Sequence, residues 1–329
     1  MSLTYQWLAD GNRITGATSP GYVLTAAELG KRIKVRVTGS KTGYSAVTAT
    51  SAATAAVAKG TLAAGTPSIS GTVKVGSTLT AGPGAWSPQP DGFAYQWLRD
   101  GSPAAGATGT TYVLQPADLG GTISVVVTGS KTGYEPAVKT SAATAAVAAG
   151  SLTTATPTIS GTAKVGQTLS AATGTWGPAP VTLAYQWLRA GVAITGATKA
   201  TYVLQAADVG KAMSVKVTGK KTGYTTVSKT SAVTAKVANG TLTSPTPTIK
   251  GTAKVGKTLT VTTGTWGPQP VTLKYQWFRS GTAIAKATSA TYKLVSKDKG
   301  KVITVKVTGS KSGFTTVTKA SAATKKVAK

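Results

Sequence analysis

Short stretches of the chain alternate apolar with polar or small side chains at a period of two. Residues 181–188 direct one set to a single face: Val181, Leu183, Tyr185 and Trp187. Residues 213–218 repeat the pattern with Met213, Val215 and Val217. Because successive side chains of a strand point to opposite faces, both stretches predict β-strands with one buried face. No stretch carries the sustained apolar stripe of an amphipathic helix, which favours an all-β fold.

Glycine and proline signals divide residues 150–239 into about seven short strands. We expect strands at residues 157–160, 168–171, 181–188, a short one through Ile194, 201–204, 213–218 and 225–237, the last with a bulge. Turns are expected at residues 161–166, 190–191, 206–210 and 221–223, and a Gly- and Pro-rich loop at 173–180. About seven strands with turns every 8 to 12 residues are typical of a β-sandwich.

The whole pattern recurs along the chain. The tripeptide Tyr-Gln-Trp begins at Tyr5, Tyr95, Tyr185 and Tyr275, 90 residues apart each time. This period is the size of a small domain rather than of a solenoid turn. We therefore divide the chain into repeat 1 (residues 1–59), repeat 2 (60–149), repeat 3 (150–239) and repeat 4 (240–329). Linkers such as residues 148–151 are brief, so we expect sandwiches of about 90 residues to form an elongated rod.

Repeat 1 is shorter than the others, because Met1 aligns with Asp91 of repeat 2. It therefore lacks the first two expected strands, and Trp7, Val35 and Val37 face an incomplete core. An open sheet with apolar residues invites pairing with another strand. We expect that preceding sequence completes this repeat. The alternative is a strand-completing partner at the first repeat, which would make the chain a filament subunit.

Several longer motifs recur with the tripeptide, among them TGTWGPxPVTLxYQWxR, ATxATYxL, AADxGK and VTGxKTGY. With these motifs the units resemble bacterial immunoglobulin-like (Ig-like) repeats of secreted and cell-wall proteins of actinobacteria. The resemblance covers nearly the whole chain and implies tandem Ig-like sandwiches with an extracellular, secreted or cell-surface location. It also implies that Leu169 and Val215 replace the antibody-type cysteine pair, so that packing replaces the cross-link.

Composition argues against an enzyme. The chain has no Cys and no His, which removes thiol nucleophiles, disulfides, the usual zinc ligands and the commonest general base. One acidic residue recurs in register, as Glu28, Asp118, Asp208 and Asp298, two residues before a Gly. A carboxylate there bonds turn amides, and one acid per unit is too few for calcium or for paired catalytic carboxylates. We expect no catalytic residues, no metal and no cofactor.

Tryptophan occurs in two settings. Trp7, Trp97, Trp187 and Trp277 lie on the third strand, and we interpret them as core residues between the sheets. The loop residues Trp86, Trp176 and Trp266 precede a Pro by two positions, and they are the aromatic candidates for a ligand. A rigid, exposed indole there would stack on a sugar ring. The alternative is an indole that plugs the end of the sandwich and bonds a carbonyl through its N–H.

Charge is distributed unevenly within a net charge of +28. Repeats 1 to 4 carry net charges of +5, 0, +8 and +15. The candidate polyanion contacts are Lys293, Lys297, Lys299, Lys301, Lys306, Lys311, Lys325, Lys326 and Lys329. The alternative is a solvated surface that keeps the protein soluble. Lys greatly outnumbers Arg, and no recognition helix is evident, which argues against sequence-specific nucleic-acid binding.

These features favour a non-catalytic extracellular stalk or spacer whose basic C-terminal repeat contacts an anionic cell-wall polymer or polysaccharide. One alternative is a carbohydrate-binding accessory module of a secreted hydrolase, which would depend on the loop tryptophans. Another is the filament subunit completed by strand donation. No apolar run approaches the roughly 20 residues that a membrane-spanning helix needs.

Overall fold

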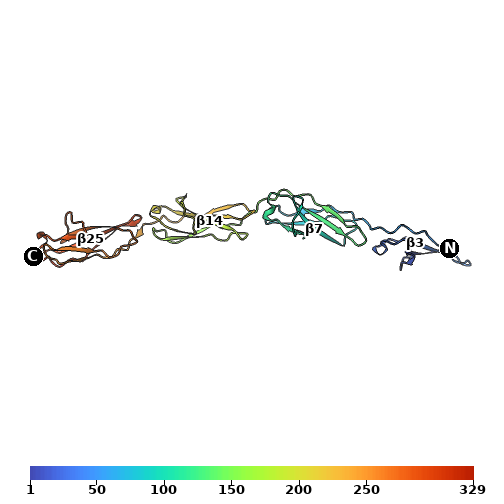
Figure 1. The fold of residues 1–329 in the computed structure, drawn as a ribbon, viewed down its shortest axis with the longest axis horizontal. Coiled ribbons are helices and arrows are strands. Elements are labelled where there is room, and N and C mark those ends of the chain that lie inside the picture. The colour runs from blue at the N-terminus through green and yellow to red at the C-terminus, as the bar shows by residue number, and fades with distance from the viewer. The chain divides into compact units, whose positions relative to one another are not determined.

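A computed structural model describes all residues from Met1 to Lys329. The structure contains β-strands and four short 3₁₀ turns: η1 (Ala26–Glu28), η2 (Pro116–Asp118), η3 (Ala206–Asp208) and η4 (Ser296–Asp298). The chain separates into two compact units, one of residues 1–151 with 222–225 and one of residues 152–221 with 226–329. Strands of both units, including β7 and β14, are seen in Figure 1. No helix is long and apolar enough to cross a bilayer.

Repeat 3 contains two antiparallel sheets. The smaller sheet has the order β12-β13-β16 and the larger the order β15-β14-β17-β18. Their strands are β12 (Thr158–Ser160), β13 (Thr168–Ala172), β14 (Thr182–Arg189), β15 (Val192–Ala193), β16 (Thr201–Val203), β17 (Met213–Lys220) and β18 (Val227–Thr230). Seven strands in a three-plus-four arrangement form an Ig-like sandwich. The predicted all-β, tandem Ig-like fold is confirmed.

Repeats 2 and 4 have the same two sheets. Repeat 2 is built from β5 (Ser68–Ser70), β6 (Thr78–Gly82), β7 (Gly92–Arg99), β8 (Ser102–Pro103), β9 (Thr111–Val113), β10 (Ile123–Ser130) and β11 (Ala137–Thr140). Repeat 4 is built from β20 (Thr248–Lys250), β21 (Thr258–Thr262), β22 (Thr272–Arg279), β23 (Thr282–Ala283), β24 (Thr291–Lys293), β25 (Ile303–Ser310) and β27 (Val317–Ala320). Two further short strands, β19 (Gly240–Thr241) and β26 (Phe314–Thr315), pair in parallel.

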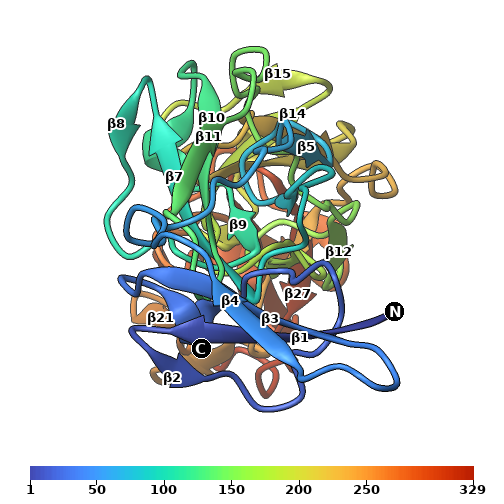
Figure 2. The same ribbon diagram turned by 90° about the vertical axis from the view of Figure 1, so that its right-hand side faces the viewer.

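Repeat 1 has only the larger sheet. Its order is β2-β1-β3-β4, with β1 (Ser2–Ala9), β2 (Asn12–Arg13), β3 (Ile33–Ser40) and β4 (Val47–Thr50). These strands lie side by side in Figure 2. The first two strands that the sequence predicted to be missing are absent, and one face of the sheet lacks the layer that covers it elsewhere.

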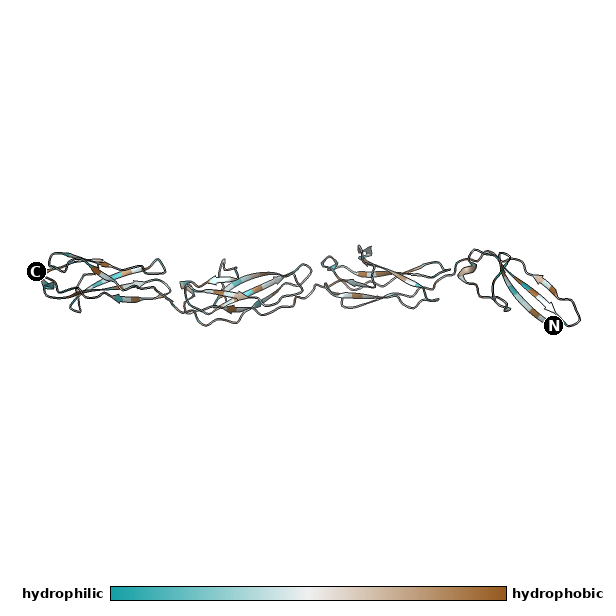
Figure 3. Cartoon of the chain, turned by 90° about the horizontal axis from the view of Figure 1, so that it is seen from below, coloured by the Kyte–Doolittle hydropathy of each residue, from teal (hydrophilic) through white to brown (hydrophobic).

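The core lies between the two sheets of each complete repeat. Trp187 stands opposite Val215 on the neighbouring strand, and both side chains are fully buried, as is Leu169 from the smaller sheet. Leu169 and Val215, which the resemblance placed at the cysteine positions, are thus both buried. Figure 3 shows brown and teal segments alternating along the strands, as the period of two requires.

The last strand is shorter than predicted. The expected strand over residues 225–237 forms a regular ladder only in β18. Beyond it, the side-chain oxygens of Ser231 and Thr234 accept hydrogen bonds from the backbone N–H groups of Val215 and Met213, each at 3.0 Å. Along this edge of β17, side-chain hydroxyl oxygens therefore accept from N–H groups that would otherwise donate to the carbonyls of a neighbouring strand. The regular strand pairing ends with β18.

Candidate functional site

The loop tryptophans point inward. Their exposed fractions are small: Trp86 7%, Trp176 8% and Trp266 1%. Each indole N–H donates to a backbone carbonyl three residues earlier, Pro83 at 2.7 Å, Thr173 at 3.0 Å and Thr263 at 3.1 Å. Buried indoles with satisfied N–H groups offer no face to a sugar ring. The structure therefore removes the main support for a carbohydrate site at these residues.

A glycine on the neighbouring strand explains how the indole fits. A Cβ atom on Gly219 would lie 2.6 Å from the Trp176 ring, and one on Gly309 would lie 2.3 Å from the Trp266 ring. Such distances are far below van der Waals contact, so only glycine lets the indole close over the end of the sandwich. The Gly of the recurring Val-Thr-Gly motif is thus a packing residue.

The tryptophans of the third strand are core residues as well. Trp97, Trp187 and Trp277 are fully buried, and each Nε1–H donates to a carbonyl 12 residues further on, at 2.9 Å. Their rings stack on Tyr112, Tyr202 and Tyr292, with centroids 5.7 to 5.8 Å apart. No part of these side chains is available to a ligand.

The recurring acid makes an ion pair that the sequence analysis did not find. Asp208 is fully buried and accepts hydrogen bonds from the Gln205 N–H at 2.6 Å and the Tyr202 hydroxyl at 3.1 Å. The predicted turn role is therefore present. In addition, the Arg189 Nε lies 2.6 Å from the carboxylate. Asp118 pairs with Arg99 and Asp298 with Arg279 in the same way.

This ion pair shifts the titration of its partners. The hydrogen bond to Asp208 raises the pKa of Arg189, so the guanidinium stays charged. Burial raises the pKa of Tyr202, and the nearby Asp208 carboxylate adds to the shift because it opposes a second negative charge. With its pKa raised, the Tyr202 phenol is neutral near neutral pH and donates to the carboxylate. The cluster holds the turn to the sheet.

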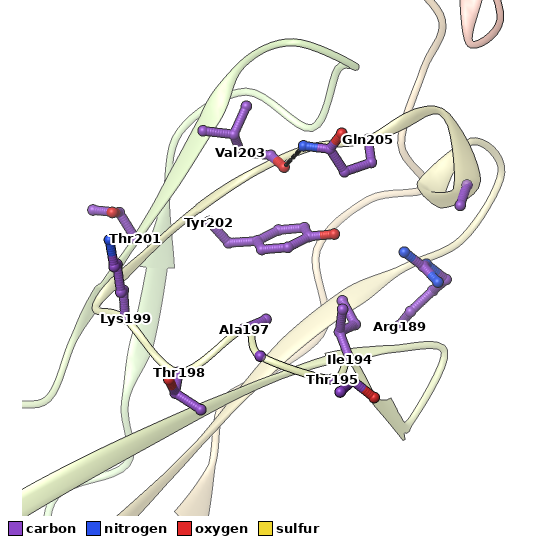
Figure 4. Close-up of a pocket in the computed structure, with 12 residues that line it drawn as sticks. Arg189, Ile194, Thr195, Ala197, Thr198, Lys199, Thr201, Tyr202, Val203 and Gln205 are labelled. Carbon is purple, nitrogen blue, oxygen red and sulfur yellow. Dashed lines mark hydrogen bonds between the residues drawn. The ribbon is translucent and has the colours of Figure 1, made fainter.

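A hollow of about 660 Å³ lies on repeat 3 beside this cluster. In Figure 4 the Tyr202 ring lies across it, with the hydroxyl directed toward Arg189. The Gln205 side chain donates to the Val203 carbonyl at 2.8 Å (Figure 4). Three polar side chains of the hollow are already bonded within the protein, since Arg189 and Tyr202 bond Asp208 and Gln205 bonds a backbone carbonyl. No group of three or more His, Cys, Asp or Glu side chains is present that could hold a metal.

The nine candidate lysines do not form one patch. Lys311 donates to the backbone carbonyls of Gln269 and Pro270, at 2.8 and 3.3 Å, next to the hairpin that follows β25. Lys306 lies on the outer face of the larger sheet, 4.9 Å from the centre of the Phe278 ring. Lys293 is on β24 of the smaller sheet. Lys306 and Lys311 thus lie on different parts of the repeat, one on a sheet face and one beside the hairpin.

The remaining candidates gather at the opposite end of β25. Residues 327–328 run in parallel between two other segments, with Val327 bridged to Lys299 and Ala328 bridged to Lys254. The Val327 N–H donates to the Lys301 carbonyl at 3.0 Å. The backbone at this end therefore brings together a set of residues that we call the lysine end: Lys254, Lys297, Lys299, Lys301, Lys326 and Lys329. Lys325 adjoins it in sequence, and Lys254 was not among the predicted residues.

Repeat 4 offers these lysines no carboxylate side chain. Its one acidic residue is Asp298, which is fully buried and bonded to Arg279. No carboxylate side chain of repeat 4 therefore balances the positive charge of the lysine end. A concentration of unpaired ammonium groups attracts polyanions, and this attraction weakens as salt is added.

Comparisons with known proteins give little beyond the fold. No family model matches the chain, and no curated protein matches it. Among solved structures, three N-terminal domains of the bacteriophage RB49 highly immunogenic outer capsid protein (Hoc) are 18% identical, with a TM-score of 0.25, and the match covers 78% of this chain and 95% of that chain. An ICAM-5 D1–D4 ectodomain fragment is 16% identical, with a TM-score of 0.28 and coverage of 90% and 83%.

Fibronectin-type domains are also among the structures found. The FN1–FN3 domains of chicken CNTN1 are 14% identical, with a TM-score of 0.19 and coverage of 82% of this chain and 97% of that chain. At identities and TM-scores this low, none of the likenesses carries a functional argument.

Proposed function

We propose that this chain is a non-catalytic, extracellular Ig-like stalk or spacer that contacts the cell surface or cell wall through repeat 4. The observation that carries the proposal is the lysine-rich repeat 4, whose one acidic side chain is buried in an ion pair. The same Ig-like unit is repeated along the chain, while the net charge rises from 0 in repeat 2 to +15 in repeat 4.

The internal use of polar and aromatic groups supports a spacer. Each complete repeat buries both of its tryptophans, and it pairs its recurring acid with an arginine. No nucleophile, base and acid are left to form a catalytic constellation. What remains on the surface of the later repeats is mainly hydroxyl groups and lysines, which suits a unit that acts by length and surface charge.

An anionic wall polymer fits this surface better than a sequence-specific nucleic-acid site. The lysine ammonium is a flexible point charge that contacts phosphate without demanding one geometry, whereas base recognition relies on bidentate arginine or amide groups. The resemblance of the recurring motifs to repeats of actinobacterial wall proteins supports an extracellular location. The absence of Cys makes the fold independent of the redox state of its surroundings.

The anchoring role can be tested by exchanging one repeat. A chain whose residues 240–329 are replaced by a second copy of residues 60–149 keeps the repeat number but loses the +15 of repeat 4. Both chains would be sedimented with purified cell walls over a salt series. We expect the original chain to bind at least tenfold more tightly at low salt, with the difference shrinking as salt rises. Equal binding would contradict anchoring through repeat 4.

A second function is favoured by the open face of repeat 1. An apolar hollow of about 400 Å³ there is lined by Met1, Leu3, Val37, Tyr44 and Val47 among others, and the Tyr44 side chain is 72% exposed. A strand-completing partner would cover this face and make the chain a filament subunit. We would add a peptide with the sequence of residues 60–90. Complementation predicts slower hydrogen exchange in β3, and unchanged exchange would contradict it.

A further inference from the structure

Each complete repeat has two distinct ends. The 3₁₀ turn lies before β25 in repeat 4, and the Lys-Ser-Gly-Phe hairpin lies after it. Since β25 is an eight-residue strand, these ends are separated by about 25 Å. The corresponding turn and hairpin flank β10 in repeat 2 and β17 in repeat 3. We call them the turn end and the hairpin end.

The turn ends of repeats 2 and 3 each receive a glycine from the next hairpin. In one unit, a Cβ on Gly313 would lie 2.7 Å from the Ala206 Cα of η3, and 3.3 Å from Val165. In the other unit, a Cβ on Gly223 would lie 2.9 Å from Pro116 of η2, and 3.1 Å from Val75. Val75 and Val165 are buried. Because glycine has no side chain, the hairpin backbone lies close against the small or apolar residues of the turn.

Lysines occupy the matching positions at the turn end of repeat 4. Lys297 stands where repeats 2 and 3 have Ala117 and Ala207, and Lys299 where they have Leu119 and Val209. The segment over residues 327–328 then brings Lys326 and Lys329 to the same end. A surface that is a joint in repeats 2 and 3 is thus a concentration of charge in repeat 4.

We propose that the lysine end is the polyanion-binding surface of this chain, and that it takes a linear polymer of phosphodiesters. This inference rests on the proposed function and locates its binding site. Each ammonium group at this end can neutralise a phosphate of such a polymer and release a condensed counterion. Lysine is also a common ligand of phosphate, acting as a point charge.

Two variants of the full chain would distinguish the contribution of the lysine end to binding from that of the total positive charge. The end variant carries Lys297→Ala, Lys299→Leu and Lys326→Ala. The sheet variant carries Lys274→Ala and Lys306→Val on the larger sheet and Lys286→Gly in the turn that follows β23. Every replacement is the residue that repeat 2 has at the same position, and each variant has three positive charges fewer than the +28 of the chain, leaving +25. Circular dichroism and thermal unfolding would establish that both variants fold as the original does.

Binding of soluble poly(glycerol phosphate), and of polygalacturonate as a carboxylate polymer, would be measured by calorimetry over a salt series. We expect the end variant to bind poly(glycerol phosphate) roughly 10- to 100-fold more weakly at low salt, with a shallower salt dependence. The affinity of the sheet variant should fall by about threefold or less.

Equal losses of affinity in both variants would contradict the lysine end as the binding surface, while leaving repeat 4 as the anchor. Tighter binding of polygalacturonate would overturn the phosphodiester assignment. No binding by the original chain would overturn the anchoring proposal itself.

Discussion

Repeat 1 and the complete repeats build the same larger sheet in different surroundings. β1 pairs with β3 over eight residues, from Ser2 opposite Ser40 to Ala9 opposite Ile33. In repeat 3, β14 pairs with β17 in the same register, from Thr182 opposite Lys220 to Arg189 opposite Met213. Burial nevertheless differs, because Trp187 is fully buried whereas Trp7 is only partly covered. Strand pairing is therefore specified within this sheet, and burial depends on the second sheet.

The turn before the central strand shows a parallel difference. Repeat 3 joins Asp208 to Arg189, whereas repeat 1 has Glu28 and, at the arginine position, Ala9. Glu28 instead accepts hydrogen bonds from the N–H and the hydroxyl of Thr25, at 2.9 and 2.7 Å. Both acids thus accept a hydrogen bond from a backbone N–H of their own turn. Repeat 3 adds an ion pair to the neighbouring strand, and repeat 1 adds a hydroxyl within the turn.

The largest contrast is expected from the strand tryptophans. Trp187→Ala should destabilise repeat 3 by about 3–5 kcal/mol, since it removes a fully buried indole and leaves a cavity. Trp7→Ala should cost about half of that or less, because the indole of repeat 1 is already partly solvated. Hydrogen exchange on the full chain, resolved by repeat, measures each effect separately. Similar losses in the two repeats would show that repeat 1 is covered in solution.

Arg189→Ala is expected to have the next largest effect. It leaves the buried Asp208 carboxylate without its charge partner, and breaking a buried pair costs about 3–5 kcal/mol. Arg189 is 31% exposed, so solvent screens part of the interaction, and we expect about 2–3 kcal/mol in the exchange of β17. Asp208→Asn in the same background should recover part of the loss. Repeat 1, with Ala9 at this position, would be unaffected by either change.

Sequence and structure agree most closely where a feature is local. The period of two located the strands, and the Gly two residues after each recurring acid located the turns. The loop tryptophans were ambiguous from sequence, because both an exposed and a buried indole suit a Pro-flanked loop. Only Gly219, which is 43 residues from Trp176, shows that the indole has a place to pack.

Features that join distant segments were not predicted, because no local sequence pattern links the residues that form them. Arg189 and Asp208 are 19 residues apart on different elements, and no local pattern links them. The lysine end combines residues near positions 254, 299 and 327, which only the folded chain brings together. The interruption of the last strand depends on Ser231 and Thr234 side chains that bond another strand. Composition predicted that repeat 4 is basic, but not which of its lysines are neighbours.

A matched pair of glycine substitutions would test the role of the smaller sheet and its loop. Gly219→Ala should destabilise repeat 3 by about 1–3 kcal/mol, because the added Cβ would meet the Trp176 ring at 2.6 Å. Gly39→Ala in repeat 1 should be nearly neutral. Its nearest neighbour is the flexible Met1 side chain, at 3.1 Å, and no loop tryptophan covers it. Exchange in β17 and β3 reports the two effects, and a large loss in repeat 1 would mean that an indole-like group also packs there.

The smallest expected effect is the pH dependence of repeat 1, whose turn is held by Glu28 without an arginine at position 9. Hydrogen bonds from the side chain and backbone of Thr25 lower the pKa of Glu28 below its usual 4.5. A carboxyl whose pKa is lower in the folded state stabilises that state above the unfolded pKa, and this stabilisation is lost as pH falls through the folded pKa. Repeat 1 should therefore be unaffected down to about pH 5 and weaken below it.

The Thr25 amide resonance, followed by NMR in isotopically labelled full-length chain, provides the measurement. We expect it to titrate with a midpoint below 4.5, since its N–H donates directly to the Glu28 carboxylate. Glu28→Gln keeps an acceptor on the side chain but removes the titrating group, so the Thr25 resonance should then stay constant over the same range. A midpoint at or above 4.5 would contradict the bonded turn. It would mean that repeat 1, without an arginine at position 9, leaves its acid to solvent.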